Sequence, residues 1–196
     1  QFCWSPDGTK VLYTCRKKTG VQYAISTDSD IFMYDLATKK TTNLCKPADY
    51  VAPAVDASIT MKDQAVNHQN ADFNVGYDVN PAFSPDGTKI AWQSRTNDGC
   101  ESDRNRLCIY DIKTGEKRYV TESFDSDVDE FVWGKDSKTL YFVGVWHSRS
   151  MVWRTDLEGK VEQITDGDYD YTGLTLCDDR LLTKRHSMSA PDDLYS

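Results

Sequence analysis

The stretch WSPDGTKVLY, residues 4–13, decides the fold because it recurs along the chain. It returns as FSPDGTKIAW at residues 83–92, in degraded form as WGKDSKTLYF at residues 133–142, and more faintly as LCDDRLL at residues 176–182. Proline suits the first corner of a turn, and Asp-Gly supplies the positive φ that a tight hairpin requires. Each copy therefore predicts a strand that ends in a tight turn and is followed by an antiparallel strand.

Two further motifs follow each of the first three copies in the same order. The first is MYDL at residues 33–36, IYDI at 109–112 and RTDL at 154–157; the second is TNL at 42–44, YVT at 119–121 and QIT at 163–165. Two more strands per copy give a four-stranded antiparallel meander of about 45 residues, the size of a propeller blade. The sequence thus predicts an all-β fold, a partial β-propeller of four-stranded antiparallel blades, with three blades and part of a fourth.

The spacing of the copies places the blades at about residues 1–45, 77–121, 128–165 and 172–196. Trp4 and Phe83 are 79 residues apart, whereas Phe83 and Trp133 are 50 apart, so residues 46–76 are expected to form an insertion between blades. Propellers usually hold four to eight blades, and an open array exposes sheet edges. We therefore expect a segment of a longer chain, or a ring completed by further copies, for example as a homodimer.

Composition excludes several classes of protein. The 196 residues are 39% hydrophobic and 12% aromatic, as in a globular protein, with a net charge of −8 and a pI near 4.8. Nucleic acid is not expected as a partner, because proteins that bind phosphate backbones carry a basic patch. A membrane is not expected either, because no window has the roughly 18 uncharged apolar residues of a membrane helix.

The six cysteines do not predict a metal site, because no two of them form a C-x-x-C pair. Cys15, Cys45 and Cys108 lie in or beside strand-like runs, where a free cysteine behaves as a small buried hydrophobic residue. A disulfide between Cys100 and Cys108 is the alternative, because a hairpin can bring the two together. The acidic run 125–130 fits the first half of an EF-hand loop, but glutamate replaces the required glycine. Neither a metal nor a cofactor is expected.

Several segments outside the repeated turn narrow the fold to a family. The Ser-Pro-Asp-Gly blades alone resemble those of TolB-like proteins and of prolyl oligopeptidase-family serine peptidases. The further segments are CRKKTG at 15–20, YAIST at 23–27, GYDVNP at 76–81, DGCESDRNRL at 98–107, WH at 146–147 and RHSMSAPDDLY at 185–195. With these segments, the chain resembles the N-terminal β-propeller of the second group, near the dipeptidyl-peptidase 5 and acylaminoacyl-peptidase-like enzymes.

The resemblance implies a non-catalytic part of a serine exopeptidase. In that family the propeller caps a C-terminal α/β-hydrolase domain, which carries the catalytic Ser, Asp and His. This chain contains no G-x-S-x-G motif, so it lacks the nucleophile and the catalytic domain. The implied role is to gate access and to help bind the amino end of a peptide substrate, in a periplasmic or secreted protein. The alternative is a TolB-like propeller that acts as a protein-binding module.

Glu101 is the first candidate for substrate binding. It lies in the long loop between Ser94 and Arg106, which joins the second and third strands of its blade. Release of dipeptides requires recognition of a free α-ammonium group. A loop carboxylate can bind this ammonium group through a charge-assisted hydrogen bond. Asp103 and Arg104 share the loop and are further candidates. The alternative is a solvated surface carboxylate paired with one of the nearby arginines.

Trp146, His147 and Arg185 are the remaining candidates. Trp146 and His147 follow a strand in the next blade, and Arg185 occupies a similar position one blade later. An aromatic ring can line a side-chain pocket, and a histidine or arginine can donate a hydrogen bond to a peptide. Packing at the ends of the blades is the alternative interpretation of all three.

Overall fold

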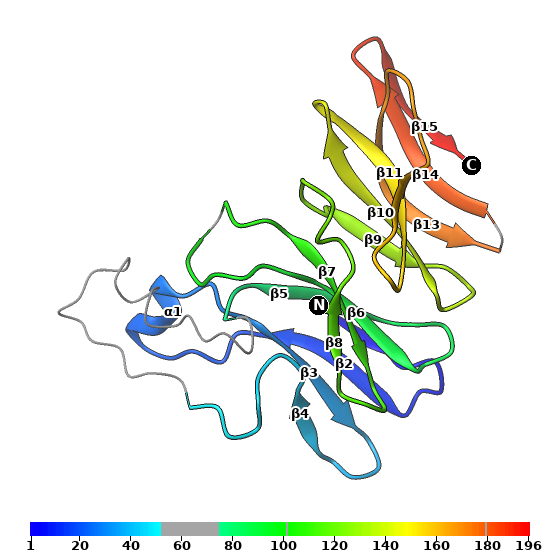
Figure 1. The fold of residues 1–196 in the computed structure, drawn as a ribbon. Helices are drawn as coiled ribbons and strands as arrows, with labels where there is room; N and C mark the ends of the chain where they lie inside the picture. The colour runs from blue at the N-terminus through cyan, green and yellow to red at the C-terminus, as the bar shows by residue number, and fades with distance from the viewer. Residues whose placement is uncertain (52–74, 101, 179) are drawn as a thin grey trace. The chain divides into compact units, whose positions relative to one another are not determined.

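The β-strands of the chain form four antiparallel sheets in the computed structural model, which describes residues 1–51, 75–100, 102–178 and 180–196 (Figure 1). Within each sheet the strands lie side by side in chain order, so every sheet is a meander. The predicted all-β fold with four-stranded antiparallel blades is confirmed. Most of the predicted insertion, residues 52–74, lies outside the described residues.

The first sheet has the order β1-β2-β3-β4, and a short helix, α1, precedes β3. The second has the order β5-β6-β7-β8, the third β12-β11-β10-β9, and the fourth, with three strands in the described part of the chain, β13-β14-β15. The bounds are β1 Phe2–Trp4, β2 Lys10–Cys15, α1 Val21–Ile25, β3 Asp30–Asp35, β4 Thr41–Asn43, β5 Asp78–Phe83, β6 Lys89–Ser94, β7 Arg106–Asp111, β8 Lys117–Tyr119, β9 Glu130–Trp133, β10 Thr139–Trp146, β11 Arg149–Asp156, β12 Val161–Gln163, β13 Asp170–Cys177, β14 Arg180–Ser187 and β15 Ala190–Tyr195.

The repeated turn has a local cause that is visible at its first copy. The carboxylate of Asp7 accepts hydrogen bonds from the Ser5 hydroxyl at 2.6 Å and from the Thr9 backbone N–H at 3.0 Å. The Ser5 hydroxyl, and after it Thr9, lower the pKa of Asp7 to about 2. Gly8 then takes a φ of 69°, which a residue without a Cβ adopts at little cost. The same bond at the second copy joins Ser84 and Asp86 at 2.6 Å.

The chain divides into two compact units. Unit 1 comprises residues 1–81 and 92–104, and unit 2 comprises residues 82–91 and 105–196. In unit 1 the fully buried side chains include Leu12, Ile31 and Trp92. Trp92 lies within β6, and its Nε1 donates to the Asp78 carboxylate at 2.8 Å.

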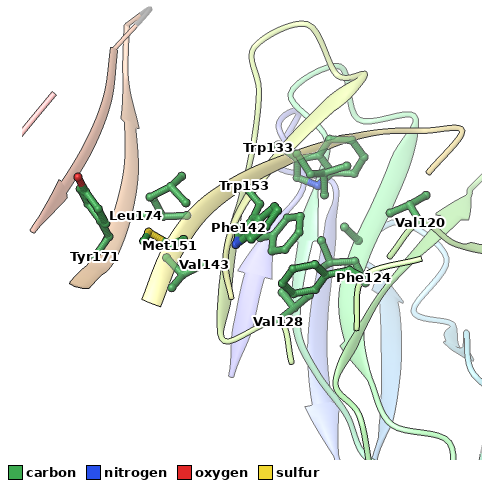
Figure 2. Packing of buried hydrophobic residues seen from close by; sticks show 14 of the residues in the cluster. Val120, Phe124, Val128, Trp133, Phe142, Val143, Met151, Trp153, Tyr171 and Leu174 are labelled. Carbon is green, nitrogen blue, oxygen red and sulfur yellow. The ribbon is translucent and has the colours of Figure 1, made fainter. Parts of the chain in front are cut away.

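Aromatic rings form the centre of the core in unit 2 (Figure 2). Phe124 lies 5.2 Å from Phe142 and 4.8 Å from Trp153 between ring centroids, which are favourable separations for tilted and edge-to-face pairs. The indole N–H of Trp153 donates to the carbonyl of Gly144 at 3.1 Å, so its polar group is also satisfied. This core joins residues of β6, β7, β9, β10, β11 and β13, and the Trp146 ring lies 6.2 Å from that of Trp153 between centroids.

All six cysteines are free thiols. Cys45 and Cys108 are buried, as expected for small hydrophobic residues, whereas Cys15 is half-buried. The alternative disulfide between Cys100 and Cys108 is not formed. Among the described residues, no helix has the length and apolar character needed to cross a membrane.

Candidate functional site

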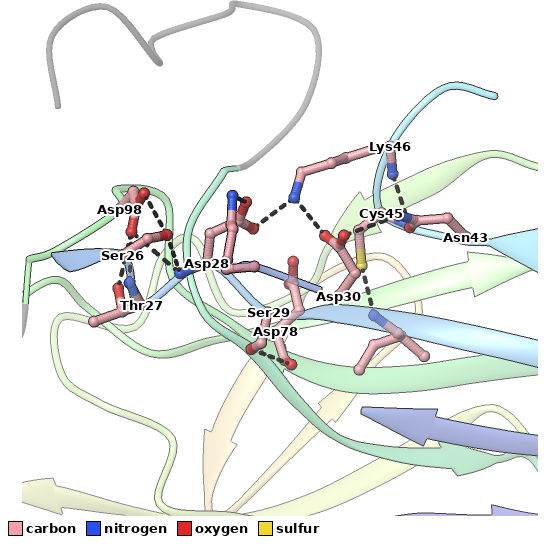
Figure 3. A network of polar contacts seen from close by, with 12 residues as sticks. Ser26, Thr27, Asp28, Ser29, Asp30, Asn43, Cys45, Lys46, Asp78 and Asp98 are labelled. Carbon is pink, nitrogen blue, oxygen red and sulfur yellow. Dashed lines mark hydrogen bonds and ion pairs between the residues drawn. The ribbon is translucent and has the colours of Figure 1, made fainter. Parts of the chain in front are cut away.

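A buried polar segment, residues 26–30, lies between α1 and the start of β3 in unit 1, and we call it the anchor segment. Ser26, Asp28, Ser29 and Asp30 are all less than a tenth exposed. Buried polar groups are costly unless they are hydrogen-bonded. The partners of the anchor segment therefore show which parts of unit 1 are held together, and they include residues of three stretches considered in turn: the loop around Asp98, Lys46, and residues 76–78 (Figure 3).

The first partner is Asp98, in the loop that was predicted to carry the substrate-binding residues. One carboxylate oxygen accepts the Ser26 hydroxyl at 2.7 Å, and the other accepts the backbone N–H of Thr27 at 2.7 Å and of Asp28 at 3.1 Å. Next to it, the N–H of Gly99 donates to the Thr27 hydroxyl at 2.8 Å. We call residues 95–104 the 95–104 loop; it is fixed to the anchor segment at this point.

The second partner is Lys46, at the start of the predicted insertion. Its ammonium group lies 2.5 Å from the carboxylate of Asp28 and 2.7 Å from that of Asp30, and its side chain is 5% exposed. Burial opposes the positive charge, but the two carboxylates outweigh it and raise the pKa of Lys46. Lys18 also pairs with Asp28 at 2.7 Å. The charges are thus paired and buried together.

The third partner is the stretch 76–78, which follows the insertion. The N–H of Ser29 donates to the Gly76 carbonyl at 3.2 Å, and the N–H of Asp78 donates to the Ser29 carbonyl at 3.1 Å. On the other side of this stretch, the Arg95 N–H donates to the Tyr77 carbonyl at 3.0 Å. The stretch therefore lies between the anchor segment and the beginning of the 95–104 loop.

A cavity of about 300 Å³ lies where these segments meet. It is lined by Thr27, Tyr77, Arg95 and Cys100. The Arg95 guanidinium carbon lies 5.8 Å from the centroid of the Tyr77 ring. Guanidinium and hydroxyl groups bind carboxylate and carbonyl oxygens, and a mixed polar and aromatic lining is typical of ligand sites. The cavity therefore offers polar contacts to a ligand beside the predicted binding loop.

The predicted site residues fall into both units. Glu101 lies outside the described residues, so its prediction stays a prediction. The carboxylate of Asp103 accepts the backbone N–H of Thr96 at 2.6 Å and of Asn97 at 2.7 Å, so this carboxylate braces the 95–104 loop internally. Arg104 is half-buried at the end of the loop.

Trp146, His147 and Arg185 belong to unit 2. Trp146 is the last residue of β10, is 39% exposed, and stacks on the His147 ring with 4.7 Å between centroids. Arg185 lies within β14, with its guanidinium carbon 4.0 Å from the Tyr169 ring centroid and 3.4 Å from that of Tyr195. Each of these side chains therefore makes packing contacts within unit 2.

A buried group of potential metal ligands, Asp30, Cys45 and Asp78, also lies in unit 1, with its ligand atoms within 4.8 Å of one another. Protein groups already contact each of them. The Ile31 N–H donates to the Cys45 sulfur at 3.2 Å, Trp92 donates to Asp78, and Lys46 pairs with Asp30. Because the buried lysine already supplies positive charge here, we infer no metal site.

Asp78 gives the stability a pH dependence. Its burial, opposed by hydrogen bonds from Ser94, Trp92 and Cys45, raises its pKa to about 7. Between about pH 4 and pH 7 the folded chain thus retains a proton that the unfolded chain has lost, so its contribution to the free energy of unfolding falls as pH rises. We expect Asp78→Asn to flatten this decline in urea denaturation at several pH values. An equally steep decline in the variant would contradict the assignment.

No protein-family model matches the chain. It is 40% identical over 195 residues to the Dipeptidyl-peptidase 5 of Porphyromonas gingivalis, which covers 99% of this chain and 25% of that protein. The chain thus spans about a quarter of the length of the curated relatives it matches.

Two solved structures show the fold. The acylaminoacyl peptidase of Pyrococcus horikoshii matches with a TM-score of 0.67 at 15% identity, over 100% of this chain and 25% of that one. The β-propeller domain of the Trilobed protease from Pyrococcus furiosus matches with a TM-score of 0.50 at 15% identity, over 99% of this chain and 63% of that one. We conclude that the chain is a β-propeller segment homologous to dipeptidyl-peptidase 5, as its resemblance to the prolyl oligopeptidase family predicted.

Proposed function

We propose that the chain is the non-catalytic propeller segment of a periplasmic or secreted serine exopeptidase. In this proposal it gates access to an α/β-hydrolase domain and helps to bind the amino end of a peptide through the 95–104 loop. The observation that carries the proposal is the 40% identity to a Dipeptidyl-peptidase 5 over 99% of the chain. The cavity beside the 95–104 loop supports it, because it offers a guanidinium and hydroxyl groups where a peptide would bind.

The proposal assigns Glu101 to the α-ammonium group of the substrate. In the full-length protein, Glu101→Ala is expected to lower kcat/KM for dipeptidyl substrates with a free amine on the order of 10- to 100-fold, because a charge-assisted contact is lost. Hydrolysis of a small ester without an ammonium group should be unaffected. Steady-state kinetics with both substrates measures the difference.

The matched control is Glu116→Ala, which removes one negative charge from an exposed turn residue of the same sheet. We expect it to leave both substrates unaffected. If Glu101→Ala reduced ester and dipeptide hydrolysis equally, the ammonium-binding role would be wrong. If the full-length protein cleaved neither substrate and instead bound protein partners, the protein-binding module would be the better interpretation.

A further inference from the structure

Two carboxylates of the 95–104 loop accept hydrogen bonds in different ways. Asp103 accepts from Thr96 and Asn97, which belong to the loop itself, so it stabilises the shape of the loop. Asp98 accepts from Ser26 and its two successors in the anchor segment, about 70 positions earlier in the chain. It therefore determines where the loop sits in unit 1. Loops are mobile unless such contacts hold them.

The contacts of Asp98 are strong for a loop residue. Its side chain is nearly buried, at 9% exposure for the residue, and both oxygens accept hydrogen bonds at 2.7 Å (Figure 3). Bonds from backbone N–H groups to a carboxylate are charge-assisted and roughly twice as strong as those between neutral groups. The Gly99 N–H adds a further bond to Thr27, so two neighbouring loop positions contact the same residue.

The anchor segment is itself well fixed. The pairs of Lys46 with Asp28 and Asp30 hold it to the chain that enters the insertion, and Ser29 holds it to the stretch 76–78 that leaves the insertion. A contact with the anchor segment therefore fixes the position of the loop within unit 1. Cys100 of the cavity lies two positions after Asp98, and Glu101 follows directly in the sequence.

We propose that Asp98 is a positioning residue for peptide binding, which holds the described part of the 95–104 loop, with Arg95 and Cys100 of the cavity, in the place where it meets the amino end of the substrate. This inference rests on the proposed function. Asp98 does not contact the substrate in this scheme; it acts through the loop. A displacement of a binding group by about 1 Å is enough to cost up to 100-fold in rate.

Three variants of the full-length protein test the proposal. Asp98→Ala removes all the bonds to the anchor segment. Asp98→Asn keeps an oxygen for the backbone N–H groups of Thr27 and Asp28. Asp7→Ala is the matched control, because the Asp7 carboxylate in the same unit also accepts three hydrogen bonds, from Ser5 and Thr9, but in a turn far along the chain from the loop.

Two measurements are made on each variant: kinetics with a dipeptidyl substrate and a small ester, and hydrogen exchange of peptides that cover residues 95–104. We expect Asp98→Ala to raise KM for the dipeptidyl substrate roughly 10- to 100-fold, to leave the ester unchanged, and to speed exchange in the loop. Asp98→Asn should have a KM and a rate of exchange in the loop close to those of the wild type. Asp7→Ala should change neither this KM nor the exchange in the loop.

Equal effects of Asp98→Ala and Asp7→Ala on KM, or an equal loss on ester and dipeptide, would overturn the positioning role. Unchanged exchange in the loop of Asp98→Ala would overturn it as well. Should the alanine variant fail to fold, Ser26→Ala takes its place, because it removes the hydroxyl that donates to Asp98 at 2.7 Å; unchanged KM and unchanged exchange in that variant would overturn the positioning role. If the wild-type protein cleaved no peptide although Asp98→Ala loosened the loop, the proposed function alone would fail.

Discussion

Replacing Lys46 by Met is expected to lower the free energy of unfolding by about 3–5 kcal/mol, the usual cost of leaving a buried charge without its partner. The ammonium group contacts both Asp28 and Asp30 in an environment with little water. Methionine fills a similar volume but cannot neutralise either carboxylate. Lys18 then remains paired with Asp28, and the Asn43 amide still donates to Asp30 at 2.9 Å but carries no charge. Urea denaturation measures the loss.

The control for Lys46→Met is Lys10→Met, in the same unit. Lys10 pairs with Asp35 at 3.5 Å, and both side chains are more than a quarter exposed. Such a pair contributes less than about 1 kcal/mol, because water screens it. Adding Asp30→Asn to Lys46→Met should recover much of the lost stability, since it removes the charge of the carboxylate that loses its lysine, whereas Asp28 keeps Lys18. A cost of Lys46→Met no larger than that of Lys10→Met would show that the buried pairs are not required.

The repeated turns could be predicted from the sequence because their causes are local. Ser5 and Ser84 each donate to an aspartate two positions later, and both bonds are 2.6 Å long. The degraded third copy keeps the aspartate, Asp136, which accepts from the backbone N–H of Lys138 at 2.9 Å. There Ser137 takes the positive φ, at 55°, that glycine takes in the first two copies. The turn survives the loss of its glycine, which a pattern of residue types alone does not indicate.

The candidate site could be predicted only in part, because its contacts join distant parts of the chain. The length of the 95–104 loop and its acidic residues predict a binding site there. The function of Asp98 in fixing the loop depends on its contact with Ser26, which lies 72 positions earlier in the chain. Lys46 was assigned to an insertion, where a lysine is expected to be exposed; its burial follows from two aspartates that precede it by 16 and 18 positions. Lysine is rarely buried unless it is paired, and the pairing is tertiary.

Gly76 is expected to tolerate no side chain, because it lies against the backbone of the 95–104 loop. A Cβ at this position would lie 2.1 Å from the Arg95 carbonyl oxygen and 2.7 Å from its carbon. Neither atom can move aside as a flexible side chain does, since the Arg95 N–H is hydrogen-bonded to the Tyr77 carbonyl at 3.0 Å. The stretch 76–78 and the loop must therefore separate, or the bonds that join them must break.

We therefore expect Gly76→Ala to lower the free energy of unfolding by at least about 1–3 kcal/mol, the range for overpacking, and to speed hydrogen exchange across residues 95–104. Gly8→Ala is the control: a Cβ there meets nothing within 4 Å, but φ is 69°, so it introduces backbone strain of about 1 kcal/mol without a clash. Urea denaturation and hydrogen exchange of both variants distinguish the effect of a steric clash from that of backbone strain. If Gly76→Ala cost no more than Gly8→Ala and left exchange in the loop unchanged, the stretch 76–78 would be free to move away from the loop, and the anchor segment would no longer account for the position of the candidate site.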